Sequence, residues 1–197
     1  MKKQTESLEN INVFDMTRVL AGPTATQILG DLGAHIIKIE RPSTGDDSRN
    51  LGPPYLDKNS EDPKESAYYL SVNRNKHSVT LDLTKKEGQS LAKDIIKKCD
   101  VLVENFRPGV MKRLGLSFDE VSKINSHIVY GSISGFGSEV FGESPYKNWP
   151  SYDVVAQAMG GLISLTGYDE RMPLKVGPGI ADIFSGSLLS FGLLASI

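Results

Sequence analysis

One carboxylate near the end of the sequence has neighbours that suit covalent chemistry. Asp182 lies in the stretch KVGPGIADIFSGSLLSFGLLASI, between a glycine-rich turn and an apolar run, with Gly177, Gly179, Ala181 and Gly186 around it. A carboxylate at the start of an apolar helix is a good N-cap, because it accepts hydrogen bonds from the first backbone N–H groups. A carboxylate among small residues can also act as a nucleophile towards an activated acyl group. The residues alone leave both roles open.

Basic and amide side chains follow the predicted strands elsewhere in the chain. These residues are Arg18, Arg41, Asn105, Arg107 and Arg113. Taken singly, they are expected to be solvated loop residues. The alternative is that they converge from separate loops on one anionic ligand, as phosphate-binding arginines do. Positions at the carboxyl edge of a parallel sheet favour this alternative.

The sequence patterns of several other chemistries are missing. The chain has no G-x-x-x-x-G-K-[ST] loop, no G-x-G-x-x-G after its first predicted strand and no G-x-S-x-G elbow. His35, His77 and His127 each begin a predicted strand, and we interpret them as structural or surface residues. Cys99 ends a predicted helix and is interpreted as a buried, inert thiol. We therefore predict no metal site.

The elements that would position these residues alternate between strand and helix. Apolar runs predict strands at 11–16, 34–40, 77–83, 100–106 and 127–134. Helices are predicted at 24–33, 84–99, 117–125 and 183–197. This alternation predicts an α/β fold, with a Rossmann-like parallel sheet that has helices on both faces. In that class, ligands bind at the carboxyl ends of the strands.

Local signals mark the ends of the predicted helices. Pro23 suits a first turn, and Gly33 suits a C-terminal cap. Two capping-box patterns predict further helix starts, Thr84 with Glu87 and Ser117 with Glu120. The long polar connection 41–65 is expected to be a functional loop, as connections of that length often are.

Composition limits the class of protein. The chain has 197 residues, 39% of them hydrophobic, which is enough for one ordinary core. A net charge of -2 gives no overall electrostatic signal for nucleic acid or for an anionic membrane. Residues 1–10 are polar and contain no apolar signal-peptide segment, and one cysteine cannot form an internal disulfide. We therefore expect a cytoplasmic protein that binds neither nucleic acid nor membrane.

Several blocks of the sequence together resemble a known family. They are TRVLAGPTATQILGDLGAHIIKIERP, GDDSRNLGPP, SAYYLSVNRNKHSVTLDL, DVLVENFRPGVMKRLGL, SISGFG, YDVVAQAMGGLISLTG and KVGPGIADIFSG. In order and spacing they are similar to the N-terminal half of the class III CoA-transferases, a family that includes α-methylacyl-CoA racemases as relatives. The resemblance implies a polar tail at 1–10. It also implies that 11–197 form the CoA-binding part of an incomplete large domain, before the family's small domain.

The resemblance assigns roles to particular residues. Asp182 falls on the family nucleophile, which forms an aspartyl anhydride and then an aspartyl-CoA thioester while CoA passes from an acyl-CoA donor to a carboxylic acid acceptor. The implied CoA contacts are Leu20, Ala21, Arg41, Leu81, Asn105, Phe106, Arg113 and Tyr152. Coenzyme A or acyl-CoA is thus the implied substrate, with a small carboxylic acid as the second one, and no metal is implied.

Three departures from relatives bear on specificity. Leu20 replaces the glutamine of formyl-CoA transferases, which argues against formate or oxalate, and Pro150 replaces a lysine found in some relatives. Tyr152 stands where the racemases have the histidine of their two-base exchange, so transferase is favoured over racemase.

The sequence resembles only the N-terminal half of the family, and this determines which partners we expect. Family members form interlocked homodimers, so a second copy or a separate C-terminal half is the implied partner. We expect little activity from residues 1–197 alone, and a non-catalytic CoA-binding remnant is the other alternative.

Overall fold

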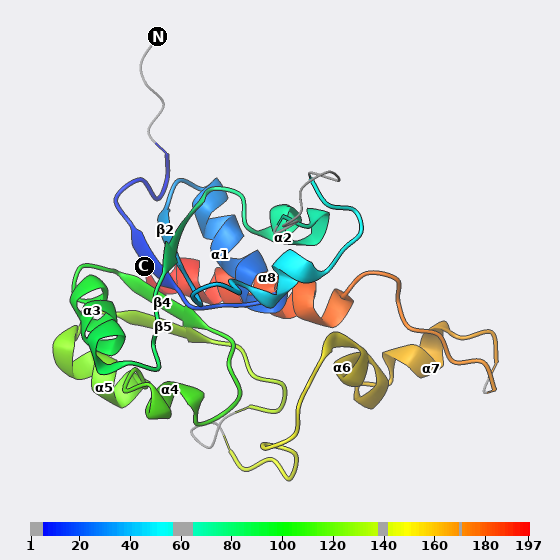
Figure 1. Ribbon diagram of the computed structural model, residues 1–197. Helices are drawn as coiled ribbons and strands as arrows, with labels where there is room; N and C mark the ends of the chain where they lie inside the picture. Colours follow the sequence, from blue (N-terminus) through cyan, green and yellow to red (C-terminus); the bar gives the residue numbers. More distant parts are fainter. Residues whose placement is uncertain (1–5, 57–64, 138–141, 170) are drawn as a thin grey trace.

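The computed structural model describes residues 6–56, 65–137, 142–169 and 171–197, and Figure 1 shows how they are arranged. Its strands are β1 (Asn12–Asp15), β2 (His35–Glu40), β3 (Lys76–Thr80), β4 (Val101–Glu104) and β5 (Val129–Ser132). They form one sheet in the order β3-β2-β1-β4-β5, and every pairing is parallel. The predicted parallel α/β sheet is confirmed.

The helices are α1 (Ala21–Asp31), the 3-10 helix η1 (Asp47–Asn50), α2 (Ala67–Val72), α3 (Lys86–Ile96), α4 (Val110–Arg113), α5 (Phe118–Ile124), α6 (Asp153–Met159), α7 (Leu162–Thr166) and α8 (Ile180–Ser196). Of these, α1 and α8 cover one face of the sheet and α3 and α5 cover the other, whereas α6 and α7 lie to one side of it (Figure 1). No described helix has the length and apolar character that crossing a bilayer requires.

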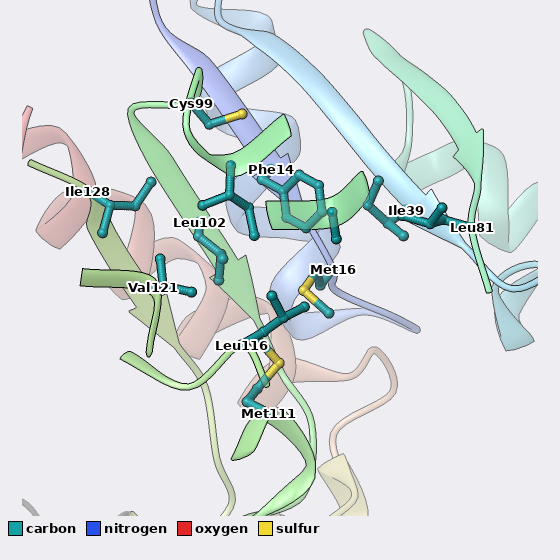
Figure 2. Packing of buried hydrophobic residues seen from close by; sticks show 12 residues of the cluster. Phe14, Met16, Ile39, Leu81, Cys99, Leu102, Met111, Leu116, Val121 and Ile128 are labelled. Atoms are coloured by element: carbon teal, nitrogen blue, oxygen red, sulfur yellow. The ribbon is translucent and has the colours of Figure 1, made fainter. Parts of the chain in front are cut away.

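Alternate residues of the strands belong to two separate hydrophobic cores, one on each face of the sheet. Phe14 and Leu102 point to one face, where they pack with buried residues of α3 and α5, including Ile96 and Val121 (Figure 2). Their strand neighbours Val13, Val101 and Val103 point to the other face, where Leu29 of α1 and Leu193 of α8 cover them. A strand buried on both faces is apolar at most of its positions, which explains the largely apolar runs in the sequence.

The predicted helix ends have mixed outcomes. Gly33 follows the last residues of α1 with φ +101°, and the capping box of Ser117 with Glu120 is present. The capping box predicted for Thr84 with Glu87 is wrong, because α3 begins after Lys85 without a side-chain cap. The hydroxyl of Thr84 instead donates to Asp82 Oδ1 at 2.6 Å. That local bond holds Thr84 in the turn before the helix.

Two buried ion pairs lie beneath the carboxyl edge of the sheet. Lys38 Nζ is 2.9 Å from Asp46 Oδ2, and Lys76 Nζ is 3.1 Å from Asp15 Oδ2. All four side chains are at most 1% exposed. Burial lowers the pKa of Lys76 to about 8, although the carboxylate of Asp15 opposes that shift. Breaking such a pair leaves an uncompensated buried charge, so these contacts fix the strand ends and the loop at Asp46.

Two histidines and the cysteine have structural surroundings within the fold, and His127 is exposed. The rings of His35 and His77 meet edge to face at 4.7 Å on neighbouring strands β2 and β3. Cys99 is buried and free, and burial raises the pKa of its thiol to about 11, so the buried thiol is confirmed. Within the described ranges, no three His, Cys, Asp or Glu side chains gather in a way that could hold a metal ion.

Candidate active site

The start of α8 places Asp182 inside the helix rather than in front of it. Gly179 is the N-cap residue, so Asp182 is the third residue of the helix and its side chain makes no cap. The cap comes from α6, where Asp153 Oδ1 accepts the backbone N–H of Ala181 at 2.8 Å and that of Asp182 at 3.4 Å. The helix-cap alternative for Asp182 is therefore wrong. A different carboxylate satisfies the helix start and leaves the side chain of Asp182 free for another role.

Space is short at Gly179, the residue before α8. A Cβ at Gly179 would lie 2.7 Å from the Leu20 side chain and 3.6 Å from Cγ of Asp153. The glycine thus lets α8 approach both the loop after β1 and the start of α6. This close approach brings Leu20, Asp153 and Asp182 together.

Two carboxylates near each other change the acidity of Asp182. Partial burial and the negative charge of Asp153 raise the pKa of Asp182 from 3.8 to about 6. Among the described residues, the Asp182 carboxylate has no hydrogen-bond or ion-pair partner, whereas Asp153 Oδ2 accepts the Gln157 amide at 2.7 Å. Burial and these two carboxylates also raise the pKa of Tyr68, which keeps its phenol protonated. Asp182 is thus a carboxylate that solvent and protein stabilise poorly, as a nucleophile requires.

A cavity of about 300 Å³ opens at the carboxyl edge of the sheet. It brings together six of the nine residues predicted from the sequence, namely Leu20, Ala21, Asn105, Phe106, Tyr152 and Asp182. Trp149, Lys147 and Ser185 also line it. These residues come from the loop after β1, the loop after β4, the segment before α6 and the first turns of α8. The prediction that separate strand ends converge on one site agrees with this arrangement.

A second cavity of about 320 Å³ adjoins the first. Its lining includes the predicted residues Arg41 and Leu81, and Arg18, Phe106 and Arg107 line both cavities. Arg113, at the end of α4, is exposed and lines neither cavity within the described structure. Asp182 thus lines the first cavity, Arg18 and Arg107 line both cavities, and the second cavity adds apolar side chains such as Leu81.

The loop after β1 is held in an uncommon conformation. Val19 has φ +68°, a left-handed backbone that is costly for a β-branched residue and persists only where its surroundings enforce it. Asp46 Oδ1 accepts the N–H of Val19 at 3.1 Å. Asn105 clamps the preceding residue, with Oδ1 accepting the N–H of Arg18 at 2.8 Å and Nδ2 donating to its carbonyl at 2.7 Å. Asn105 thus positions the loop through its side chain as well as lining the cavity.

The arginines at the junction of the two cavities are not isolated. The guanidinium of Arg18 lies over the Phe106 ring at 4.8 Å, and its Nη1 is 3.3 Å from Asp47 Oδ2. Arg41 Nη2 pairs with the other oxygen, Oδ1, of the same carboxylate. Arg18 and Arg41, from the loops after β1 and β2, thus share one carboxylate, and their convergence on an anionic ligand stays a prediction.

Three parts of the site were not predicted as such. Asp153, which caps α8, and Gln157, which donates to Asp153 Oδ2, lie in the block YDVVAQAMGGLISLTG of the sequence, but only the fold shows that α6 meets α8. Asp47 lies in the long connection 41–65, within the block GDDSRNLGPP, but no role was predicted for it. Residues 57–64 of that connection lie outside the described residues.

Comparison with known proteins agrees with this geometry. The model of the CoA-transferase family III matches residues 8–197. Mouse succinyl-CoA:glutarate CoA-transferase is 42% identical over 95% of this chain and 40% of its own length. The succinyl-CoA:mesaconate CoA-transferase of Haloarcula hispanica is 38% identical over 97% of this chain and 48% of its own length.

The fold has a solved counterpart. The crystal structure of a CAIB/BAIF family protein from Brucella suis superposes with a TM-score of 0.90 at 38% identity, covering 98% of this chain and 49% of that one. The chain thus spans about half the length of the relatives it matches. With the family model extending over nearly the whole sequence, this chain belongs to the CoA-transferase family III.

Proposed function

We propose that this chain supplies the CoA-binding region and the nucleophile of a CoA-transferase. The observation that supports the proposal most directly is the first cavity, which Asp182 lines together with Leu20, Ala21 and Phe106. In this proposal, 11–197 form the CoA-binding part of a large domain. The names of the relatives, which act on succinyl-CoA with glutarate or mesaconate, support an acyl-CoA and a small carboxylic acid as the substrates.

The two cavities suit the two ends of a CoA molecule. The arginines Arg18, Arg41 and Arg107 lie where the cavities meet or in the second cavity, and guanidinium groups bind phosphate through paired hydrogen bonds. Leu81 and Phe106 offer apolar surface beside them. The phosphates and nucleoside would occupy the second cavity, and the pantetheine arm would reach the first cavity and deliver its thioester to Asp182.

The chemistry then follows from a poorly stabilised carboxylate. An oxygen of Asp182 attacks the thioester carbonyl of the donor, the C–S bond breaks, and CoA leaves as a thiolate, which gives an acyl-aspartyl anhydride. The thiolate attacks the aspartyl carbonyl, forms an aspartyl-CoA thioester and releases the donor acid. The acceptor carboxylate attacks that thioester to form a second anhydride. The thiolate attacks the acceptor carbonyl of this anhydride, which releases acyl-CoA and restores Asp182.

The surroundings of Asp182 support this role. A pKa of about 6 leaves the carboxylate ionised at neutral pH, while keeping it less stabilised than an exposed carboxylate. Because the reaction needs the ionised form, transfer should decline as the pH falls through about 6.

The proposal also includes a second part of the enzyme, corresponding to the half of the relatives that this chain does not match. Either a C-terminal half or a second copy would complete the enclosure of Asp182, as in the interlocked homodimer of the family. A racemase-like activity is disfavoured because Tyr152, which lines the first cavity, stands where that reaction needs a histidine base. A binding protein without catalysis remains the competing function.

The proposal is tested first by binding and then by trapping. Titration calorimetry of residues 1–197 with CoA should show binding, and replacing Asp182 by Ala should leave that affinity nearly unchanged. The chain is next mixed with succinyl-CoA and a separately expressed C-terminal half of a succinyl-CoA:glutarate CoA-transferase. Hydroxylamine should then convert the activated Asp182 into a hydroxamate, which peptide mass spectrometry can locate.

The controls separate the two functions. The Asp182→Ala chain should give no hydroxamate and no transfer. CoA binding without any hydroxamate in the completed enzyme would favour the binding protein. A hydroxamate on another residue would remove Asp182 from the mechanism.

A further inference from the structure

Asp47 joins the arginines of the two cavities. Its Oδ2 is 3.3 Å from Arg18 Nη1, and its Oδ1 pairs with Arg41 Nη2. Arg18 lines both cavities, Asp47 lines the first and Arg41 lines the second. One carboxylate therefore occupies N–H donors of both guanidinium groups, which the phosphates of CoA would need.

The segment around Asp47 is anchored on both sides. Asp46 is buried and accepts the Ser48 N–H at 2.9 Å, and the carbonyl of Ser48 accepts the hydroxyl of Ser66 at 2.6 Å. Arg49 donates to the Glu40 carboxylate through Nε and Nη2, each at 2.7 Å. These contacts hold the backbone on either side of Asp47, whereas its exposed side chain is free to turn.

The position of Arg18 does not depend on Asp47. The backbone of Arg18 is clamped by Asn105, and its guanidinium lies over the Phe106 ring. The Asp47 side chain is 53% exposed, and an ion pair in that setting contributes little to stability. The contact therefore adds little to holding the site together. Its main effect is to neutralise the arginines before a ligand arrives.

We propose that Asp47 is a resident counter-ion that competes with the phosphates of CoA for Arg18 and Arg41 and so limits the affinity for CoA. The inference rests on the proposed function, because it assumes that these arginines face a phosphorylated ligand. A bound phosphate would take over the guanidinium hydrogen bonds and turn the Asp47 side chain out towards solvent. An enzyme that must release one acyl-CoA after each exchange benefits from such a limit on affinity.

The test is the replacement Asp47→Asn, which keeps the size of the side chain and removes its charge. Calorimetry on residues 1–197 should show CoA binding that is roughly three- to tenfold tighter than for the unchanged chain. Pantetheine, which has no phosphate, should bind both chains equally. The gain for CoA should shrink as salt is added, because exposed charges are screened.

Two controls show whether the effect is local. Asp94→Asn removes the same charge from α3, where Asp94 pairs with Lys97 and lines neither cavity, so CoA affinity should not change. In an Arg41→Gln background, Asp47→Asn should give a smaller gain, because one of the two competing contacts is already gone.

The outcomes separate the inference from the function beneath it. Equal CoA affinity for the Asp47→Asn and unchanged chains would overturn the inference and leave the proposed function in place. Weaker CoA binding by Asp47→Asn would mean that Asp47 orients the arginines, and would also overturn it. No CoA binding by either chain would overturn the inference and the proposed function together.

Discussion

The carboxylates of Asp153, on α6, and Asp182, on α8, both lie near the first turn of α8, but their surroundings differ. Asp153 accepts two backbone N–H groups and the Gln157 amide, so its charge is well stabilised. Asp182 is partly buried beside that charge, and its pKa rises to about 6. The helix cap and the proposed nucleophile are thus different residues, and the capping residue makes the other one less stable as an anion.

This arrangement predicts that Asp182 costs stability. Its pKa is raised in the folded chain, so the folded state is favoured when Asp182 is protonated, and that advantage is lost as the pH rises from about 4 through about 6. Asp182→Asn should therefore raise the free energy of unfolding by about 1–3 kcal/mol at about pH 7.5, with the difference vanishing towards about pH 4. Urea denaturation at both pH values measures this.

The matched variant changes the neighbour instead. Asp153→Asn keeps an oxygen that can accept the N–H groups of α8 but removes the charge, so the pKa of Asp182 should move back towards 3.8. NMR titration of the Asp182 side chain follows that shift. A pKa that stays near 6 would mean that burial alone is responsible.

At the scale of elements, α1 and α8 cross at a point with no room for a side chain. A Cβ at Gly186 would lie 2.3 Å from the carbonyl oxygen of Ala21 and 3.0 Å from Cβ of Thr24. Both helices line the first cavity, α1 through Ala21 and α8 through Asp182. The close crossing therefore helps to fix the position of Asp182 relative to Ala21.

Two glycines of α8 should respond to alanine with opposite signs. Gly186→Ala forces the backbones apart and should lower the free energy of unfolding by about 1–3 kcal/mol. Gly192→Ala meets nothing within 4 Å and should raise it by about 0.5–1 kcal/mol through helix propensity. Denaturant unfolding of both variants is the measurement. A neutral Gly186→Ala would mean that the helices can separate without cost.

The sequence was most informative about the elements. Apolar runs separated by helical patterns gave the parallel sheet, because strands buried on both faces leave that signal. Thr84 misled because its side chain bonds to Asp82 nearby, and a capping box cannot be told from such a turn by residue type alone. The α6–α8 contact and the buried Lys38–Asp46 pair could not be predicted, since both arise from long-range packing rather than from local pattern.

On the scale of the whole molecule, α8 presents an apolar stripe to solvent. Phe184, Leu188 and Phe191 are 62%, 52% and 64% exposed, at a spacing that places them on one face of the helix. Isolated exposed apolar residues are ordinary, whereas a continuous stripe of large ones favours association.

Residues 1–197 should therefore self-associate as concentration rises. Phe191→Glu places a charge in the stripe and should shift the chain towards monomer in sedimentation velocity. Leu165→Glu is the control, since Leu165 is also exposed but lies on α7, away from the stripe. A chain that stays monomeric at all concentrations, or equal effects of the two variants, would contradict this prediction.

The position of Trp149 has a practical consequence. It is the only tryptophan of the chain, and it lies in the wall of the first cavity, with its ring 4.9 Å from that of Tyr146. Fluorescence excited selectively in tryptophan therefore arises from one residue in the wall of the first cavity. Binding and release of a ligand in this cavity should change the tryptophan fluorescence, so stopped flow can measure both rates without a label.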